Sequence, residues 1–147
     1  MNKITIEPPT LADIDTIWKW GNENWELWYS EDAEEKWFSK KYLKNWITNT
    51  KNDVLLVARK DGFLVGMCLT YVVHNWALCS ELFVAKAYRG YGIGALLLTK
   101  LEEMLRPKGI EIIELFVNVD NKSAQGFYKK VGYQGRNKFF AMHKKIA

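Results

Sequence analysis

Residues 81–95 read ELFVAKAYRGYGIGA, a strand-like stretch followed by a glycine-rich turn and the start of a helix that is predicted over Gly92–Leu105. Three of five consecutive positions in the turn are glycine, whereas a turn that only starts a helix needs one. Without Cβ atoms, backbone N–H groups can approach a bulky anion, and a helix start adds unpaired N–H donors and the positive end of its dipole. We therefore expect the turn to hold a diphosphate, with Arg89 as a cation at its rim.

The sequence on either side of this turn predicts alternating strands and helices. Lys60-Asp61-Gly62 is a short-hairpin signal between two apolar runs, and Thr10 followed by Asp13 predicts the start of the first helix. The other predicted helices are Asp32–Asn49 and Lys122–Val131, and the predicted strands are Lys3–Glu7, Val54–Ala58, Phe63–Val73, Trp76–Val84, Ile110–Val117 and Lys138–Lys145. We expect an α/β fold, a single domain over residues 1–147 with a mixed central sheet of about six or seven strands flanked by about four helices.

The composition fits one globular domain. The chain has 147 residues, 48% hydrophobic and 26% charged, which suffices for one core but not for two ordinary domains. No apolar run is long enough to span a membrane and the first residues lack an export signal, so we expect a cytoplasmic protein with no membrane partner. Cys68 and Cys79 fall in apolar strand-like segments and are expected to be buried reduced thiols, and no metal site is expected.

Other phosphate ligands fit the glycine turn less well. Residues 90–95 also satisfy the dinucleotide pattern G-x-G-x-x-A, with Glu111 or Glu114 roughly 20 residues further on. The dinucleotide fold needs two mononucleotide-binding halves, however, and only about fifty residues follow the turn. A Walker phosphate loop is excluded because no Gly-Lys-Ser/Thr follows.

Two motifs resemble one family. Residues 89–94, RGYGIG, match the Q/R-x-x-G-x-G/A signature of the GNAT acetyltransferase superfamily, and residues 118–133, NVDNKSAQGFYKKVGY, resemble its second motif, N-x-x-A-x-x-F/L-Y-x-x-x-G-F/Y. The resemblance is strong over Trp76–Tyr133, while residues 10–50 agree only in their two-helix pattern. It implies a single-domain GNAT fold and an N-acetyltransferase that uses acetyl-CoA as cosubstrate.

The resemblance also implies roles for particular residues. Main-chain groups of the fourth strand would hold the pantetheine arm, with an N–H near Phe83 polarising the thioester carbonyl, and the glycine turn would hold the diphosphate. Tyr128 aligns with the residue that protonates the departing thiolate, although it could instead be an amphipathic helix residue packed on the core. The implied cofactor-binding residues are Leu82, Phe83, Val84, Arg89, Gly90, Tyr91, Gly92, Ile93, Gly94, Ala95, Asn121 and Phe127.

The general base is less clear from the sequence. The family often places a glutamate one residue before Glu81 or on the fifth strand, where this chain has Ser80 and Phe116. Strand side chains alternate between faces, so Glu81 would point into the cleft only if a bulge in the strand rotates it. Glu81 is therefore one candidate base, and the alternatives are His74 or a water chain to a helix acid such as Glu23 or Glu26.

The acceptor is suggested by the first third of the chain. Five of the seven tryptophans lie between residues 18 and 37, and residues 1–50 hold nine acids against six bases. Aromatic faces together with carboxylates favour cations, so we expect a polycationic small molecule such as a polyamine or an aminoglycoside, with a protein lysine or N-terminus as the competitor. The acids could equally form a solvated face over core tryptophans. The candidate acceptor residues are Glu23, Trp25, Glu26 and Trp28.

Two other functional classes compete with the enzyme. A non-catalytic acyl-CoA sensor is compatible with the missing glutamate. A nucleic-acid binder is suggested by the pI of about 9.0, but the basic residues are scattered among the cofactor motifs instead of forming a stripe, so no nucleic-acid partner is expected. The sequence leaves open whether the protein forms a homodimer.

Overall fold

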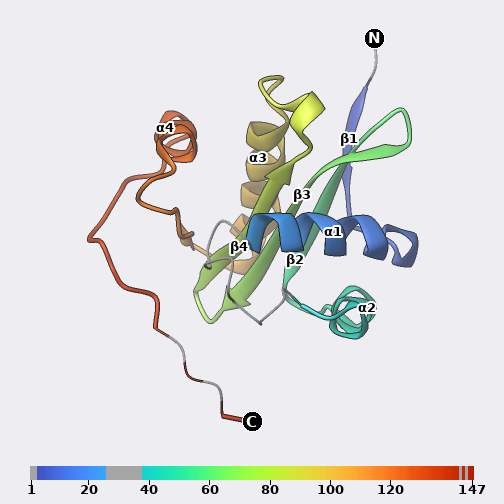
Figure 1. Ribbon diagram of the computed structural model, residues 1–147, viewed down its shortest axis with the longest axis horizontal. Helices are drawn as coiled ribbons and strands as arrows, with labels where there is room; N and C mark the ends of the chain where they lie inside the picture. Colours follow the sequence, from blue (N-terminus) through green and yellow to red (C-terminus); the bar gives the residue numbers. More distant parts are fainter. Residues whose placement is uncertain (1–2, 26–37, 143, 145) are drawn as a thin grey trace. The chain divides into compact units, whose positions relative to one another are not determined.

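The computed structural model describes residues 3–25, 38–142, 144 and 146–147, with the side chain of Trp25 left out. The chain divides into two units, Met1–Phe116 and Val117–Ala147. The first unit contains the sheet (Figure 1).

A five-stranded mixed sheet is the centre of the first unit. Its strands are β1 (Ile4–Glu7), β2 (Val54–Lys60), β3 (Phe63–Val73), β4 (Trp76–Val84) and β5 (Ile112–Glu114), in that spatial order. Neighbouring strands are antiparallel except for β4 and β5, which are parallel. The turn between β2 and β3 has Asp61 and Gly62 at φ 51° and 83°, the left-handed conformations that a two-residue hairpin needs. The predicted hairpin is therefore confirmed.

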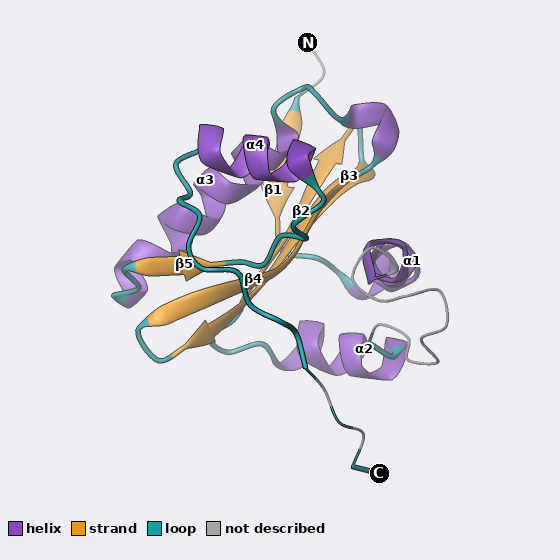
Figure 2. Cartoon of the chain, turned by 60° about the vertical axis from the view of Figure 1, so that its left-hand side comes forward, coloured by secondary structure: helices purple, strands orange, loops and turns teal. Residues whose placement is uncertain are grey.

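Helices cover both faces of this sheet (Figure 2). One face carries α1 (Ile14–Trp25) and α2 (Lys40–Asn49), and the other carries α3 (Ile93–Leu105). The core under α1 and α2 consists of Ile17, Trp20, Leu43, Trp46, Leu55, Val57, Met67 and Leu69, and the buried face of α3 consists of Ile93, Leu97, Leu98, Leu101 and Leu105. Because burial of one such side chain contributes about 1.5–3 kcal/mol, these two layers hold the helices against the sheet.

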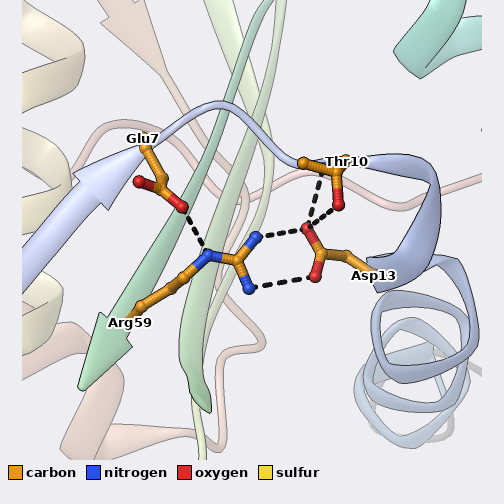
Figure 3. A network of polar contacts seen from close by, with 4 residues as sticks. All are labelled: Glu7, Thr10, Asp13 and Arg59. Carbon is orange, nitrogen blue, oxygen red and sulfur yellow. Dashed lines mark hydrogen bonds and ion pairs between the residues drawn. The ribbon is translucent and has the colours of Figure 1, made fainter. Parts of the chain in front are cut away.

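A buried ion pair joins the start of α1 to the sheet (Figure 3). Asp13 ends a short 3-10 turn, Leu11–Asp13, and its two carboxylate oxygens accept from the guanidinium of Arg59 on β2 over 3.0 and 2.6 Å. Asp13 also accepts from the backbone N–H of Thr10 over 2.7 Å, which confirms the helix start predicted there. Arg59 also donates to Glu7 on β1. The network thereby ties two strands to the first turn before α1.

The second unit contains the helix α4 (Lys122–Lys130). The side chain of Asn121 caps it by accepting from the backbone N–H of Ala124 over 3.0 Å. The rings of Phe127 and Tyr128 lie edge to face at 5.1 Å, and those of Tyr128 and Tyr133 at 5.6 Å. This aromatic row occupies the last turns of α4 and the residues just after it.

The predicted strand count is wrong in one respect. The α/β class and the mixed sheet are confirmed, but the described residues form five strands and not six or seven. None of the described residues within Lys138–Lys145 is in a strand, and Phe139 and Phe140 are 78% and 95% exposed. The described residues of this segment therefore lack both the neighbouring strand and the burial that a strand in a sheet requires.

Other boundaries differ by less. The strand predicted over Ile110–Val117 is paired only over Ile112–Glu114, and α3 begins at Ile93 because Gly92 is its N-cap. The second predicted helix is present over Lys40–Asn49, and the beginning of its predicted range, up to residue 37, lies outside the described residues. None of the helices in the described part of the chain is both long enough and apolar enough to cross a membrane.

Candidate active site

A bulge in β4 redirects the strand in its middle. Leu69 of β3 pairs with Glu81, but the next residue, Thr70, pairs with Cys79, so Ser80 is an extra residue without a partner in the register. The hydroxyl of Ser80 donates to the carbonyl of Leu69 over 3.1 Å. A bulge of this kind changes which face the following side chains occupy.

The bulge places Glu81 on the face that carries α1. Before the bulge, Cys79 lies on the α3 face, where its sulfur is 3.7 Å from that of Cys68. After it, Glu81 is beside the core residue Leu69 and accepts a hydrogen bond from Asn24 of α1 over 2.6 Å. In a regular strand residues 79 and 81 would share a face. The rotation that a catalytic Glu81 requires is therefore present.

The second half of β4 is not paired with the parallel strand β5. Pairing with β5 runs from Trp76 to Leu78, opposite Glu114, whereas β4 continues to Val84. Among the described strands, the β5 side of β4 beyond Leu78 has no ladder partner. The predicted pantetheine residues Leu82, Phe83 and Val84 all lie in this stretch, so their main-chain groups on that side can bond to the amides of a ligand.

The glycine turn leads into α3 as predicted. Gly90 and Gly92 have φ of 82° and 80°, a left-handed conformation that disfavours any residue with a Cβ. A Cβ added at either glycine would meet no atom within 4 Å, so the turn borders open space. The backbone N–H of Leu96 bonds to Gly92, which leaves the N–H groups of residues 93–95 as the unpaired first-turn donors of a thirteen-residue helix. This arrangement suits a diphosphate.

Arg89 connects the turn to the end of β4. Its Nε donates to the carbonyl of Val84 over 2.8 Å, and its guanidinium lies 5.5 Å from the centre of the Phe83 ring. Phe83 in turn packs on Trp20 of α1, with ring centres 5.2 Å apart. Arg89, the predicted cation, is therefore exposed but lies against β4. Its contacts connect the glycine turn to the end of that strand.

Glu81 on β4 provides a buried carboxylate, since this residue is only 6% exposed. Its partner Asn24 was not identified from the sequence, because nothing in the local pattern connects positions 57 residues apart. The alternative bases fit less well: His74 is an exposed residue in the turn at the other end of β4, and Glu23 is an exposed acid paired with Lys19 at 4.0 Å.

The predicted residues of the second unit lie on one short helix. Tyr128 is half-buried in the aromatic row, and Phe127 is its neighbour in that row. The side-chain oxygen of Asn121 is engaged as the cap of α4. The predicted acceptor residues Glu26 and Trp28, and the side chain of Trp25, lie outside the described residues. The described part of the chain contains no group of three His, Cys, Asp or Glu residues that could hold a metal ion.

These features define a site for a long ligand with amides at one end and phosphates at the other. The bulged strand without its parallel neighbour provides main-chain partners for the amides, and the glycine turn with the helix start provides donors for the phosphates. Coenzyme A has this order of groups. The fold and the site thus define a protein of the acyl-CoA-binding class.

The chain belongs to the acetyltransferase (GNAT) family, whose family model matches residues 14–133. It is accordingly an acyltransferase that uses acetyl-CoA. The spermidine N(1)-acetyltransferase of Thermoplasma acidophilum is 29% identical to it in an alignment that covers 89% of this chain and 88% of that protein.

Two solved structures share the fold. The PaiA N-acetyltransferase of Thermoplasma acidophilum, in complex with coenzyme A, has a TM-score of 0.81 and 25% identity, with 93% of each chain covered. An aminoglycoside acetyltransferase from an uncultured soil metagenomic sample, in complex with sisomicin, has a TM-score of 0.76 over 98% of this chain and 97% of that one. Its identity is 17%, so this second likeness concerns the fold alone.

Proposed function

We propose that this protein transfers the acetyl group of acetyl-CoA to a primary amine of a polyamine or a similar polycationic small molecule. The observation that carries the proposal is the β4 bulge, which turns a buried carboxylate, Glu81, toward α1 at the end of the strand that leads into the glycine turn. A spermidine acetyltransferase among the relatives supports a polyamine acceptor, as does the excess of acids in residues 1–50.

The proposed reaction is direct attack of the amine on the thioester. Glu81 accepts the proton of the amine, directly or through one water, while the C–N bond forms and the C–S bond breaks. A main-chain N–H near Phe83 stabilises the negative charge that develops on the carbonyl oxygen. Tyr128 donates its phenolic proton to the departing sulfur and recovers it from solvent, a role that rests on the family resemblance.

The cofactor contacts remain part of the proposal. We assign the pantetheine arm to the main chain of Leu82–Val84 and the diphosphate to residues 89–95, with further contacts at Asn121 and Phe127. One domain over residues 1–147 is supported by the family model, whose match includes residues of both units. Two buried free thiols, Cys68 and Cys79, support a reducing compartment such as the cytoplasm.

An acceptor screen tests the proposal. Release of the coenzyme A thiol by the purified protein is measured with spermidine and other polyamines, with aminoglycosides, and with basic peptides that carry a free N-terminus. We expect the highest kcat/KM for a polyamine. A preference for neutral or anionic acceptors would contradict the proposed acceptor class.

The same assay separates an enzyme from a non-catalytic acyl-CoA sensor. Tyr128→Phe is expected to lower kcat about 100-fold and to leave coenzyme A binding unchanged, because it removes only the proton donor. Tyr133→Phe is the matched control, since this phenol belongs to the same aromatic row and has no proposed catalytic role. A wild-type protein that binds acetyl-CoA but releases no thiol with any acceptor would be a sensor.

A further inference from the structure

A hydrogen bond from α1 holds the Glu81 carboxylate. The side-chain amide of Asn24 donates through Nδ2 to Oε2 of Glu81 over 2.6 Å. A bond of this kind to a carboxylate is charge-assisted and about twice as strong as one between neutral groups. Because the Glu81 residue is 6% exposed, water competes little for the same oxygen. The contact therefore fixes the orientation of one carboxylate oxygen.

The side chain of Asn24 makes a contact outside its own helix. The residue lies in the last turn of α1, and asparagine forms a helix less readily than alanine. Two positions earlier, the side chain of Asn22 donates to the carbonyl of Trp18 in the same helix over 2.7 Å. Asn24 instead reaches a different element, β4, so its amide serves a tertiary contact.

Tyr71 on β3 is one titratable group near Glu81. Burial is the largest cause that raises the pKa of this phenol, followed by its contact with the Tyr42 hydroxyl of α2 at 3.5 Å, and then by the charges of Asp53 and Glu81. Since the pKa of Tyr71 lies above its ordinary value, the phenol stays neutral throughout the pH range in which carboxylates titrate.

Cys79 on β4 is a second titratable group whose pKa is affected by the charge of Glu81. The contact with the Cys68 thiol and burial raise the pKa of Cys79, and the charge of Glu81 raises it further. This thiol is therefore also neutral wherever a carboxylate loses its proton. Neither Tyr71 nor Cys79 changes charge in that range, so neither of these two groups adds a pH step of its own there.

We propose that Asn24 is a positioning residue for catalysis, which holds the Glu81 carboxylate in the orientation and the ionised form that accept the proton of the attacking amine. This inference rests on the proposed function, in which Glu81 is the base. A donor to the charged form of an acid favours ionisation, so the loss of the Asn24 amide makes Glu81 protonate at a higher pH.

The test is the pH dependence of kcat/KM at saturating acetyl-CoA, measured on the full chain with the preferred amine. In Asn24→Ala the acid limb is expected to move up by about one pH unit, which is about a tenfold loss of kcat/KM at pH values below the limb. Asn24→Asp has nearly the same shape but places a second carboxyl beside Glu81, so a larger upward shift is expected. Asn22→Ala is the matched control and should keep the wild-type limb.

Protonation of the acceptor amine produces a limb of its own. The profiles are therefore measured with two acceptors whose amine pKa values differ, because the limb due to the enzyme stays at the same pH with both. Thermal unfolding of each variant shows whether it is folded at the assay temperature, and Asn24→Asp, as the near-isosteric change, keeps the test valid if the alanine variant unfolds.

The outcomes for the inference and for the proposed function are distinct. Wild-type turnover and its loss in Glu81→Gln report on the proposed function, and full activity of Glu81→Gln would remove both the base and the inference. If Glu81→Gln is inactive while both Asn24 variants keep the wild-type acid limb, the proposed function stands and Asn24 is only a structural contact.

Discussion

At the scale of the residue, Asp13 makes the stability of the protein depend on pH. Burial alone would raise the pKa of its carboxyl, but hydrogen bonds from Arg59 and Thr10 outweigh burial, and the pKa lies below its ordinary value of 3.8. An acid with a lowered pKa in the folded state contributes stability above its unfolded pKa, and this contribution is lost as the pH falls through the folded pKa. The Asp13–Arg59 pair therefore stabilises the fold at neutral pH and ceases to do so in acid.

We expect Asp13→Asn to lower the free energy of unfolding by about 3 kcal/mol at pH 7, because it leaves the largely buried Arg59 charge without its main partner. The difference from the wild type should shrink progressively below about pH 4. Urea unfolding at several pH values measures both effects. Glu7→Gln is the control, since the Glu7 side chain is 46% exposed and its loss should cost less than about 1 kcal/mol. Equal losses at pH 7 and in acid would contradict this role.

At the scale of the element, the glycine turn is the feature whose geometry is easiest to test. Gly92→Val is expected to weaken coenzyme A binding at least about tenfold, because the branched side chain would project into the open space where the diphosphate is proposed to lie. Valine is also strained at a φ of 80°. Gly62→Val places the same residue at a φ of 83° in the β2–β3 turn and controls for that strain. Calorimetric titration with coenzyme A measures the affinities, and equal losses in the two variants would refute the assignment.

Elements whose signals are local could be predicted from the sequence. The glycine turn, the Asp61-Gly62 hairpin and the helix that begins at Lys122 each depend on a few adjacent residues, and the structure contains all three. The strand expected over Lys138–Lys145 was wrong because a strand also needs a partner, which its own sequence does not specify.

The sequence could not decide which face of the sheet Glu81 occupies; it could only state that Glu81 faces the cleft if the strand contains a bulge. Its face depended on a bulge, and the register that creates the bulge is set by the pairing of β4 with β3. Asn24 could not be found at all, because a contact between α1 and β4 leaves no trace in the pattern of either segment. The motifs thus indicated the candidate cofactor-binding residues, whereas the environment of the candidate base could be described only from the tertiary structure.

At the scale of the whole molecule, the two units are expected to unfold together. The unit Val117–Ala147 has 31 residues, and domains of fewer than about 40 residues usually need disulfides or metals to fold alone. Both cysteines of the chain are in the other unit, so a disulfide within the smaller unit is excluded.

Calorimetry should therefore show a single unfolding transition whose enthalpy agrees with the van't Hoff value. Coenzyme A at about 100 times its Kd should stabilise the protein by about 2.7 kcal/mol and shift that one transition upward. Two separate transitions, with only one responding to coenzyme A, would show that residues 1–147 do not form one domain.

The extra residue in β4 divides the strand into halves with opposite alternation. Before the bulge the odd-numbered residues Ala77 and Cys79 face α3. After the bulge the odd-numbered residues, beginning with Glu81, face α1. A deletion or insertion of one residue between Cys79 and Glu81 would move the carboxylate and the Phe83 ring to the face that carries α3. A substitution in β4 changes one side chain, whereas a change of length there would reverse the face of every position that follows.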